Sequence, residues 1–158
     1  MSQLPQETQQ GYEAPFVRQF SIFLENRVGR LLDVLRLFDD AENLTIHGLA
    51  VMESSDCAVV RVVVDNDDVA RSMLRNSTYA FAETDLLVVE LTDDLPMSML
   101  CLYLLGAELN IHFMYPLLAT GHEASGGRIA LCVDDNTFAG QILLRKGFRL
   151  LGSGDLDS

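Results

Sequence analysis

The turn formed by residues 26–30, with the sequence NRVGR, has the clearest chemical potential in the chain. It contains one amide, two guanidinium groups and one glycine, and it joins a strand-like segment, 18–25, to a helix-like segment, 29–40. The first turn of a helix has backbone N–H groups without intrahelical acceptors and carries the positive end of the helix dipole, so it can hold an anion. A lone glycine is also common punctuation between a strand and a helix. The residues of the turn leave both interpretations open.

Two histidines and two apolar side chains are further candidates for ligand contacts. His47 and His112 occupy equivalent positions and could bind a metal or touch a ligand carboxylate. No third metal ligand has a suitable spacing, because His122 falls in a predicted loop, and a histidine on a sheet face or at an interface is the competing interpretation. Met114 and Tyr115 could line a small-molecule pocket or serve in ordinary packing.

No catalytic motif stands out in the sequence. A nucleophile beside a general base, a pair of catalytic carboxylates and a phosphate-binding loop are all missing from the pattern. The acidic runs at 65–68 and 134–136 lack the length and the glycine of a calcium loop, and helix capping explains them better. We therefore expect a non-enzymatic protein with no catalytic residue, no metal and no cofactor.

Composition and charge narrow the range of partners. The chain has 158 residues, is 49% hydrophobic and carries a formal net charge of −12. Such an acidic chain repels phosphate backbones and anionic lipid surfaces, so we expect neither nucleic-acid nor membrane binding. The three widely spaced cysteines are typical of a reducing compartment, and no apolar run approaches the length of a bilayer span. The expected location is the cytoplasm.

The order of predicted elements is strand, helix, strand, strand, helix, strand, and it occurs twice after a flexible N-terminal tail at residues 1–15. Alternation on the second strand places Leu44, Ile46 and Ala50 toward the helices. The expected segments of the first half are 18–25, 29–40, 44–53, 57–64, 69–75 and 79–82. Those of the second half are 85–91, 97–105, 110–119, 128–133, 137–146 and 148–151.

The two halves also share short motifs. LTIH at 44–47 parallels LNIH at 109–112, and VDND at 64–67 parallels VDDN at 133–136. The sequence thus predicts an α+β fold of two ferredoxin-like βαββαβ units, one at 16–84 and one at 85–155. Such a unit leaves one face of its sheet uncovered, and these strands are apolar on both faces. We expect the two units to pair with each other, and two chains to pair in turn.

Over residues 16–155 the sequence resembles that of tandem ACT-domain proteins. The stretch FLENRVGRLLDVLRLFDDAENLTIHGLAV is similar to the opening of an ACT domain, and ELTDDLPMSMLCLYLLGAELNIHFMYPLL is similar to a second opening. The stretch ALCVDDNTFAGQILLRKGFRLL is similar to the closing strand, helix and strand of that family. The resemblance implies a regulatory module that binds an amino acid, forms a homodimer and acts on a partner enzyme.

In that family the ligand lies where the strand-to-helix turn of one unit meets its neighbour. Glycine would let the backbone approach the ligand, and the amide of Asn26 could cap the helix or hold a polar group. In the second half Met97 stands at the expected glycine position, Pro96 lacks an N–H, and the loop and helix look about one turn shorter. We therefore expect a single good site, in the first half. The candidate ligand contacts are Asn26, Arg27, Val28, Gly29, Arg30, Leu31, His112 and Met114.

The residues leave two alternatives open. The first half also resembles the regulatory subunit of acetohydroxyacid (acetolactate) synthase, through the LEN motif at 24–26, Gly29 and the LF pair at 37–38. A structural adaptor without a ligand is the other alternative. The sequence names neither the ligand nor the regulated partner.

Overall fold

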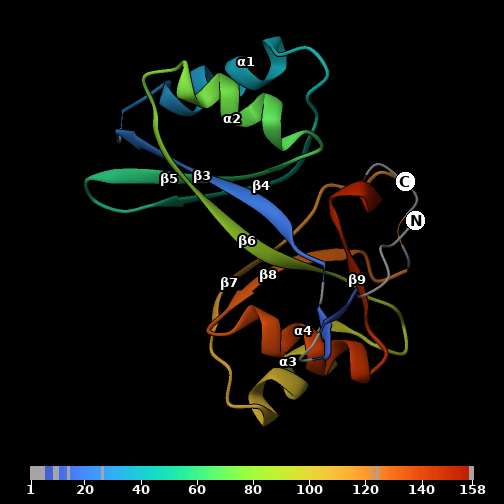
Figure 1. Cartoon of the computed structure of the whole chain (residues 1–158). Coiled ribbons are helices and arrows are strands. Elements are labelled where there is room, and N and C mark those ends of the chain that lie inside the picture. The colour runs from blue at the N-terminus through green and yellow to red at the C-terminus, as the bar shows by residue number, and fades with distance from the viewer. Residues whose placement is uncertain are drawn as a thin grey trace. The chain divides into compact units, whose positions relative to one another are not determined.

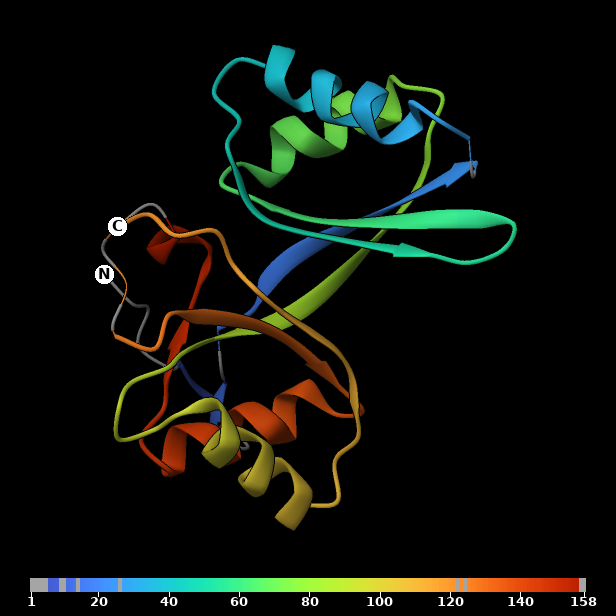
Figure 2. The same cartoon turned by 180° about the vertical axis from the view of Figure 1, so that it is seen from behind.

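The computed structural model of the chain describes residues 6–8, 11–13, 15–25, 27–121, 123 and 125–156. Contacts among these residues form two compact units. The first unit is Arg18–Thr84, and the second contains the residues from Asp85 onward together with those before Arg18. Each unit has the order strand, helix, strand, strand, helix, strand, with both helices on one side of its sheet (Figures 1 and 2). The predicted α+β fold of two ferredoxin-like units is confirmed.

The first unit has the strand order β4-β5-β3-β6. Strand β5 lies antiparallel to both β3 and β4. Its elements are β3 (Val17–Glu25), α1 (Arg30–Asp40), β4 (Ile46–Glu53), β5 (Cys57–Val64), α2 (Asp67–Arg75) and the beginning of β6 (Ala80–Glu90).

The second unit repeats this order as β7-β8-β6-β9, with antiparallel pairing throughout. Residues 1–15 are predicted to be a tail, but strands β1 and β2 form an antiparallel pair there. The elements are β1 (Gln6–Thr8), β2 (Gly11–Glu13), the end of β6, α3 (Met97–Gly106), β7 (Ile111–Pro116), β8 (Arg128–Val133), α4 (Asn136–Arg145), β9 (Arg149–Leu151) and the short helix η1 (Ser153–Asp155).

The two segments predicted as separate strands, 79–82 and 85–91, form one continuous strand, β6. Neither glycine nor proline occurs between them, so nothing in the chain breaks the extended backbone. The first part of β6 alternates between exposed and half-buried residues, whereas Leu86–Val89 is fully buried. One strand therefore contributes to both units.

Strand β3 shows how alternation builds the core of the first unit. Phe20, Ile22 and Leu24 are buried against the helices, and Phe23 between them is 43% exposed. Burying these side chains removes apolar surface from water, at about 25 cal/mol per Å2.

Strands β4 and β7 each contain a β-bulge, at His47 and His112 respectively. A bulge adds one residue to its strand and shifts the alternation beyond it. Leu49, rather than Ala50, consequently packs against the core of the first unit. The prediction that Ala50 faces the helices is wrong for this reason.

The duplication is visible in the backbone as well. Asn43 and Glu108, which precede the second strand of each unit, both have a φ angle of 58°. Asp65 accepts a hydrogen bond of 2.8 Å from the N–H of Thr45, just before β4. Asp134 accepts the equivalent bond of 3.1 Å from the N–H of Asn110, just before β7. These matched details support the short sequence motifs as true repeats.

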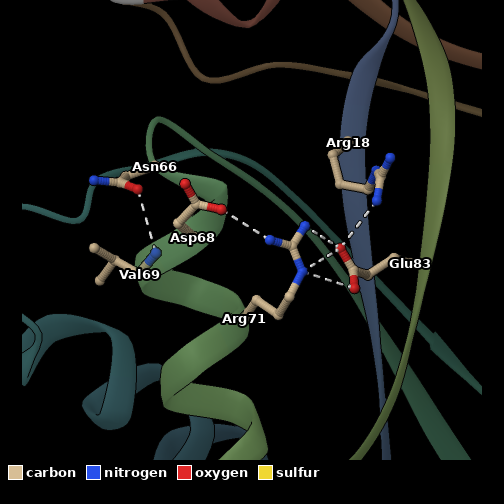
Figure 3. Close-up of polar contacts among 6 residues, drawn as sticks. All are labelled: Arg18, Asn66, Asp68, Val69, Arg71 and Glu83. Carbon is tan, nitrogen blue, oxygen red and sulfur yellow. Dashed lines mark hydrogen bonds and ion pairs between the residues drawn. The ribbon is translucent and has the colours of Figure 1, made fainter.

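Side-chain caps begin the second helix of each unit but not the first. Asn66 accepts from the N–H of Val69 at 3.2 Å (Figure 3), and Asp135 accepts from the N–H of Phe138 at 3.0 Å. The sequence prediction that the acidic runs cap helices is confirmed at both positions. No side-chain cap is present at the start of α1 or α3 among the described residues.

A group of charged side chains, the Glu83 clasp of Arg18, Arg71 and Glu83, ties β3, α2 and β6 together (Figure 3). The Glu83 carboxylate accepts from Arg71 Nη2 at 2.6 Å and from Arg18 Nη1 at 3.2 Å. The hydrogen bond from Arg71 lowers the pKa of Glu83 below its usual value. Asp68, which is almost fully exposed, makes a further ion pair with Arg71 at 2.9 Å.

Candidate ligand-binding site

The connection between β3 and α1 is a tight turn. The N–H of Arg27 donates to the carbonyl of Glu25 at 2.8 Å, and the N–H of Arg30 donates to the carbonyl of Arg27 at 3.3 Å. Gly29 has φ 88° and ψ −11°, the conformation of the third residue in a type II turn. Glycine adopts this left-handed conformation without steric cost. A Cβ atom at Gly29 would meet nothing within 4 Å, so backbone conformation and not crowding explains the residue.

The first turn of α1 has open hydrogen-bond donors. Gly29 is the N-cap residue, and its carbonyl accepts from the N–H of Asp33 at 3.0 Å. The N–H groups of Leu31 and Leu32 have no acceptor among the described residues. Asn26, which is predicted to cap this helix or hold the ligand, lies outside the described residues.

A hollow of about 160 Å3, the turn hollow, lies beside this helix start. Its aliphatic lining comes from β3, α1, β4 and β5, namely Leu24, Leu31, Val51 and Ala58. Its charged lining is Glu25, Arg27, Arg30 and Glu53. The turn hollow lies entirely within the first unit.

The two arginines of the turn hollow differ in their partners. Arg27 Nε lies 2.9 Å from Glu25 Oε2, in an exposed ion pair. Arg30 instead has its guanidinium over the ring of Tyr79, with Cζ 5.5 Å from the ring centroid. The Nε atom of Arg30 is buried and has no hydrogen-bond partner among the described residues. Buried donors are usually paired, so Arg30 has unused capacity for an acceptor.

Strand register brings together residues that the sequence interpretation missed. Leu24 pairs with Ala58, and Ala58 pairs with Glu53, which forms one row across three strands beside the turn. The short polar segment 54–56 between the predicted strands 44–53 and 57–64 is typical of a hairpin, and a hairpin there implies the Ala58–Glu53 pair. The neighbouring position of Leu24 follows only from the strand order.

The predicted ligand contacts do not all lie at the turn hollow. Arg27, Arg30 and Leu31 lie together in the lining of the turn hollow, whereas Val28 is fully exposed and outside that lining. His112 and Met114 belong to β7 of the second unit. His112 Nε2 lies 2.8 Å from Asp134 Oδ1, and Met114 packs against the core of that unit.

The turn before α3 has a different character. Pro96 is the N-cap residue of α3 and therefore the counterpart of Gly29, which corrects the assignment of that position to Met97. The connection, residues 91–96, is longer than residues 26–29, and α3 has 10 residues against 11 in α1, so the predicted shortening is wrong. Asp93 and Asp94 are exposed beside this turn, where the first unit has arginines.

Neither a metal site nor a membrane-spanning helix is found among the described residues. No group of three or more histidine, cysteine, aspartate or glutamate side chains could hold a metal ion in this part of the chain. Among the same residues, no helix is both long and apolar enough to cross a membrane.

Comparisons with known proteins agree with the duplicated fold. The chain matches the family model described as the ACT domain pair over residues 16–156, and it therefore belongs to that family. The structure of protein BT0572 from Bacteroides thetaiotaomicron is similar, with a TM-score of 0.79, 25% identity and coverage of 92% of this chain and 98% of that chain.

The ligand-free regulatory subunit of aspartate kinase from Thermus thermophilus has a TM-score of 0.54 and 8% identity, over 93% of this chain and 99% of that chain. At that identity the likeness concerns the fold alone. No curated protein matches the chain.

Proposed function

We propose that this ACT domain pair is a non-catalytic regulatory protein that binds an amino acid in the turn hollow. The observation that carries the proposal is the start of α1, where the N–H groups of Leu31 and Leu32 have no acceptor among the described residues, beside a hollow that Arg27 and Arg30 line. A carboxylate suits such donors, because it accepts several hydrogen bonds and is favoured by the positive end of the helix dipole. Family membership supports a regulatory use of this binding.

A single site per chain follows from the charges beside the two turns. Arg27 and Arg30 balance the two glutamates beside the first turn, whereas Asp93 and Asp94 have no such balance beside the second turn and repel a carboxylate. Pro96 also removes one N–H donor from the second turn. The proposed domains are 16–84, which binds the ligand, and 85–155.

A screen of the twenty amino acids for thermal stabilisation tests the proposal. A ligand that binds only the folded chain raises the melting temperature, and the stabilisation grows with the logarithm of one plus the ratio of ligand concentration to Kd. Arg30→Met keeps the apolar stem of the side chain but loses its donors, and we expect it to weaken affinity about 10- to 100-fold. Arg36→Met, at an exposed position of the same helix, is the matched control and should bind like the wild type.

Two results would remove the sensor proposal. If no amino acid shifts the melting temperature, the sensor proposal fails and the alternative of a structural adaptor without a ligand stands. Equal affinities of Arg30→Met and Arg36→Met would place the ligand elsewhere. The alternative of an acetohydroxyacid synthase regulatory subunit also requires that the chain binds an amino acid, and it differs only in the enzyme that is regulated. The same screen therefore tests both.

We also propose that two chains form a homodimer. Phe23, Val59 and Met52 pair in one row across β3, β5 and β4, on the sheet face away from the helices, and Phe23 and Met52 are 43% and 52% exposed. An exposed apolar row of this kind marks a contact surface. Sedimentation velocity should give the mass of two chains, and a single-chain mass at micromolar concentration would contradict the proposal.

A further inference from the structure

The turn hollow has an aliphatic floor. Leu24 and Ala58 come from neighbouring positions of β3 and β5, and Leu31 comes from α1. Val51 adds to this floor and is 49% exposed, so its side chain has apolar surface left to cover. A ligand group that lies on these four side chains gains by removing apolar surface from water. A charged group in the same place would lose hydration without gaining a partner.

The charged residues of the turn hollow sum to zero. Two arginines, Arg27 and Arg30, stand against two glutamates, Glu25 and Glu53. An amino acid in its zwitterionic form also has no net charge, and its ammonium and carboxylate groups each find an opposite charge here. Because Arg27 already pairs with Glu25, a third charge on the ligand side chain would have to compete with that ion pair for a counterpart.

The volume limits the ligand as well. About 160 Å3 is well below the roughly 300–1,000 Å3 typical of sites for drug-sized molecules. The space suits a molecule of amino-acid size, and it disfavours large bicyclic side chains.

We infer that the ligand of the turn hollow is an α-amino acid with an uncharged aliphatic side chain, which lies on the floor formed by Leu24, Leu31, Val51 and Ala58. This inference rests on the proposed amino-acid function and adds the class of side chain. Arg30 and the start of α1 hold the carboxylate, and the glutamates face the ammonium group.

Leucine and aspartate are the most informative pair of probes, because their side chains have a similar branched outline and differ in charge. Isothermal titration calorimetry of the full chain should show leucine, isoleucine or valine binding at least about 10-fold more tightly than aspartate or lysine. Val51→Asp should weaken binding of the aliphatic ligand by about 10-fold or more, since it replaces an apolar side chain of the floor with a hydrated carboxylate.

Leu102→Asp is the matched control for Val51→Asp. Leu102 lies on α3 of the second unit, is about as exposed as Val51 and belongs neither to the turn hollow nor to the proposed dimer contact. Circular dichroism verifies that both variants fold, and Leu102→Asp should keep the affinity of the wild type.

Each outcome has a distinct meaning. If aspartate, lysine or another charged amino acid binds more tightly than every aliphatic one, the inference is overturned while the proposed function stands. If Val51→Asp binds the aliphatic amino acid as well as Leu102→Asp does, the aliphatic floor is not the contact surface, and the inference is again overturned. If no amino acid binds at all, the proposed function itself fails.

Discussion

Gly29 illustrates how a single residue combines structural and functional demands. Its positive φ completes the type II turn, and this turn places the start of α1, which has no side-chain cap, beside the turn hollow. The same residue therefore determines where the open N–H groups point. Its conformational role is sufficient to explain why glycine occupies the position.

Gly29→Ala should lower the free energy of unfolding by about 1–2 kcal/mol, because alanine is strained in the left-handed region. Gly106→Ala is a suitable control, since that glycine ends α3, has an ordinary φ and also has open space around a Cβ. We expect it to be neutral or stabilising by up to about 1 kcal/mol. Urea unfolding measures both, and equal effects of the two substitutions would contradict the conformational role of Gly29.

Residue types predicted some of these features and concealed others. The capping oxygens of Asn66 and Asp135 follow directly from a short acidic run before an apolar helix. The bulges at His47 and His112 do not, because a bulge depends on how two strands pair. Glu53 escaped the site prediction for a similar reason, since its place beside the turn depends on how β5 pairs with β3.

At the scale of elements, β6 shows where local patterns stop being informative. Residues 79–82 and 85–91 each predict a strand, and only the paired sheet reveals that they are one. The Glu83 clasp lies in the merged region and joins β6 to β3 and α2 (Figure 3). It holds the last part of β6 that belongs to the first unit.

Glu83→Gln should lower the melting temperature at pH 7 by more than Asp68→Asn, because Glu83 is mostly shielded from solvent and Asp68 is not. The pKa of Glu83 is lowered in the folded chain, mainly by the hydrogen bond from Arg71. Its stabilisation is therefore full above the ordinary glutamate pKa of about 4.5 and is lost as the pH falls through the lower folded pKa.

Differential scanning calorimetry between pH 3 and pH 7 follows this difference. The gap between wild type and Glu83→Gln should narrow toward the acidic end, whereas Asp68→Asn should stay close to the wild type throughout. A gap that widens on acidification would contradict the assigned ion pairs.

At the scale of the whole chain, duplication preserves the fold and changes the sites. The two units share their strand order, their left-handed residues and the caps of their second helices. They differ at the first turn, where Gly29 and Arg30 correspond by cap position to Pro96 and Met97. The sequence predicted this asymmetry, although it assigned the glycine counterpart one residue too late.

The most direct test of the ligand site is a nuclear magnetic resonance titration of the full chain with the amino acid found in the screen. The amide protons of Leu31 and Leu32 should move downfield and saturate at a single ligand per chain, because they gain a charged acceptor. The amide of Val69, already capped by Asn66, should stay in place. Saturable downfield shifts at Ser98 in α3, with Leu31 and Leu32 unchanged, would contradict the site.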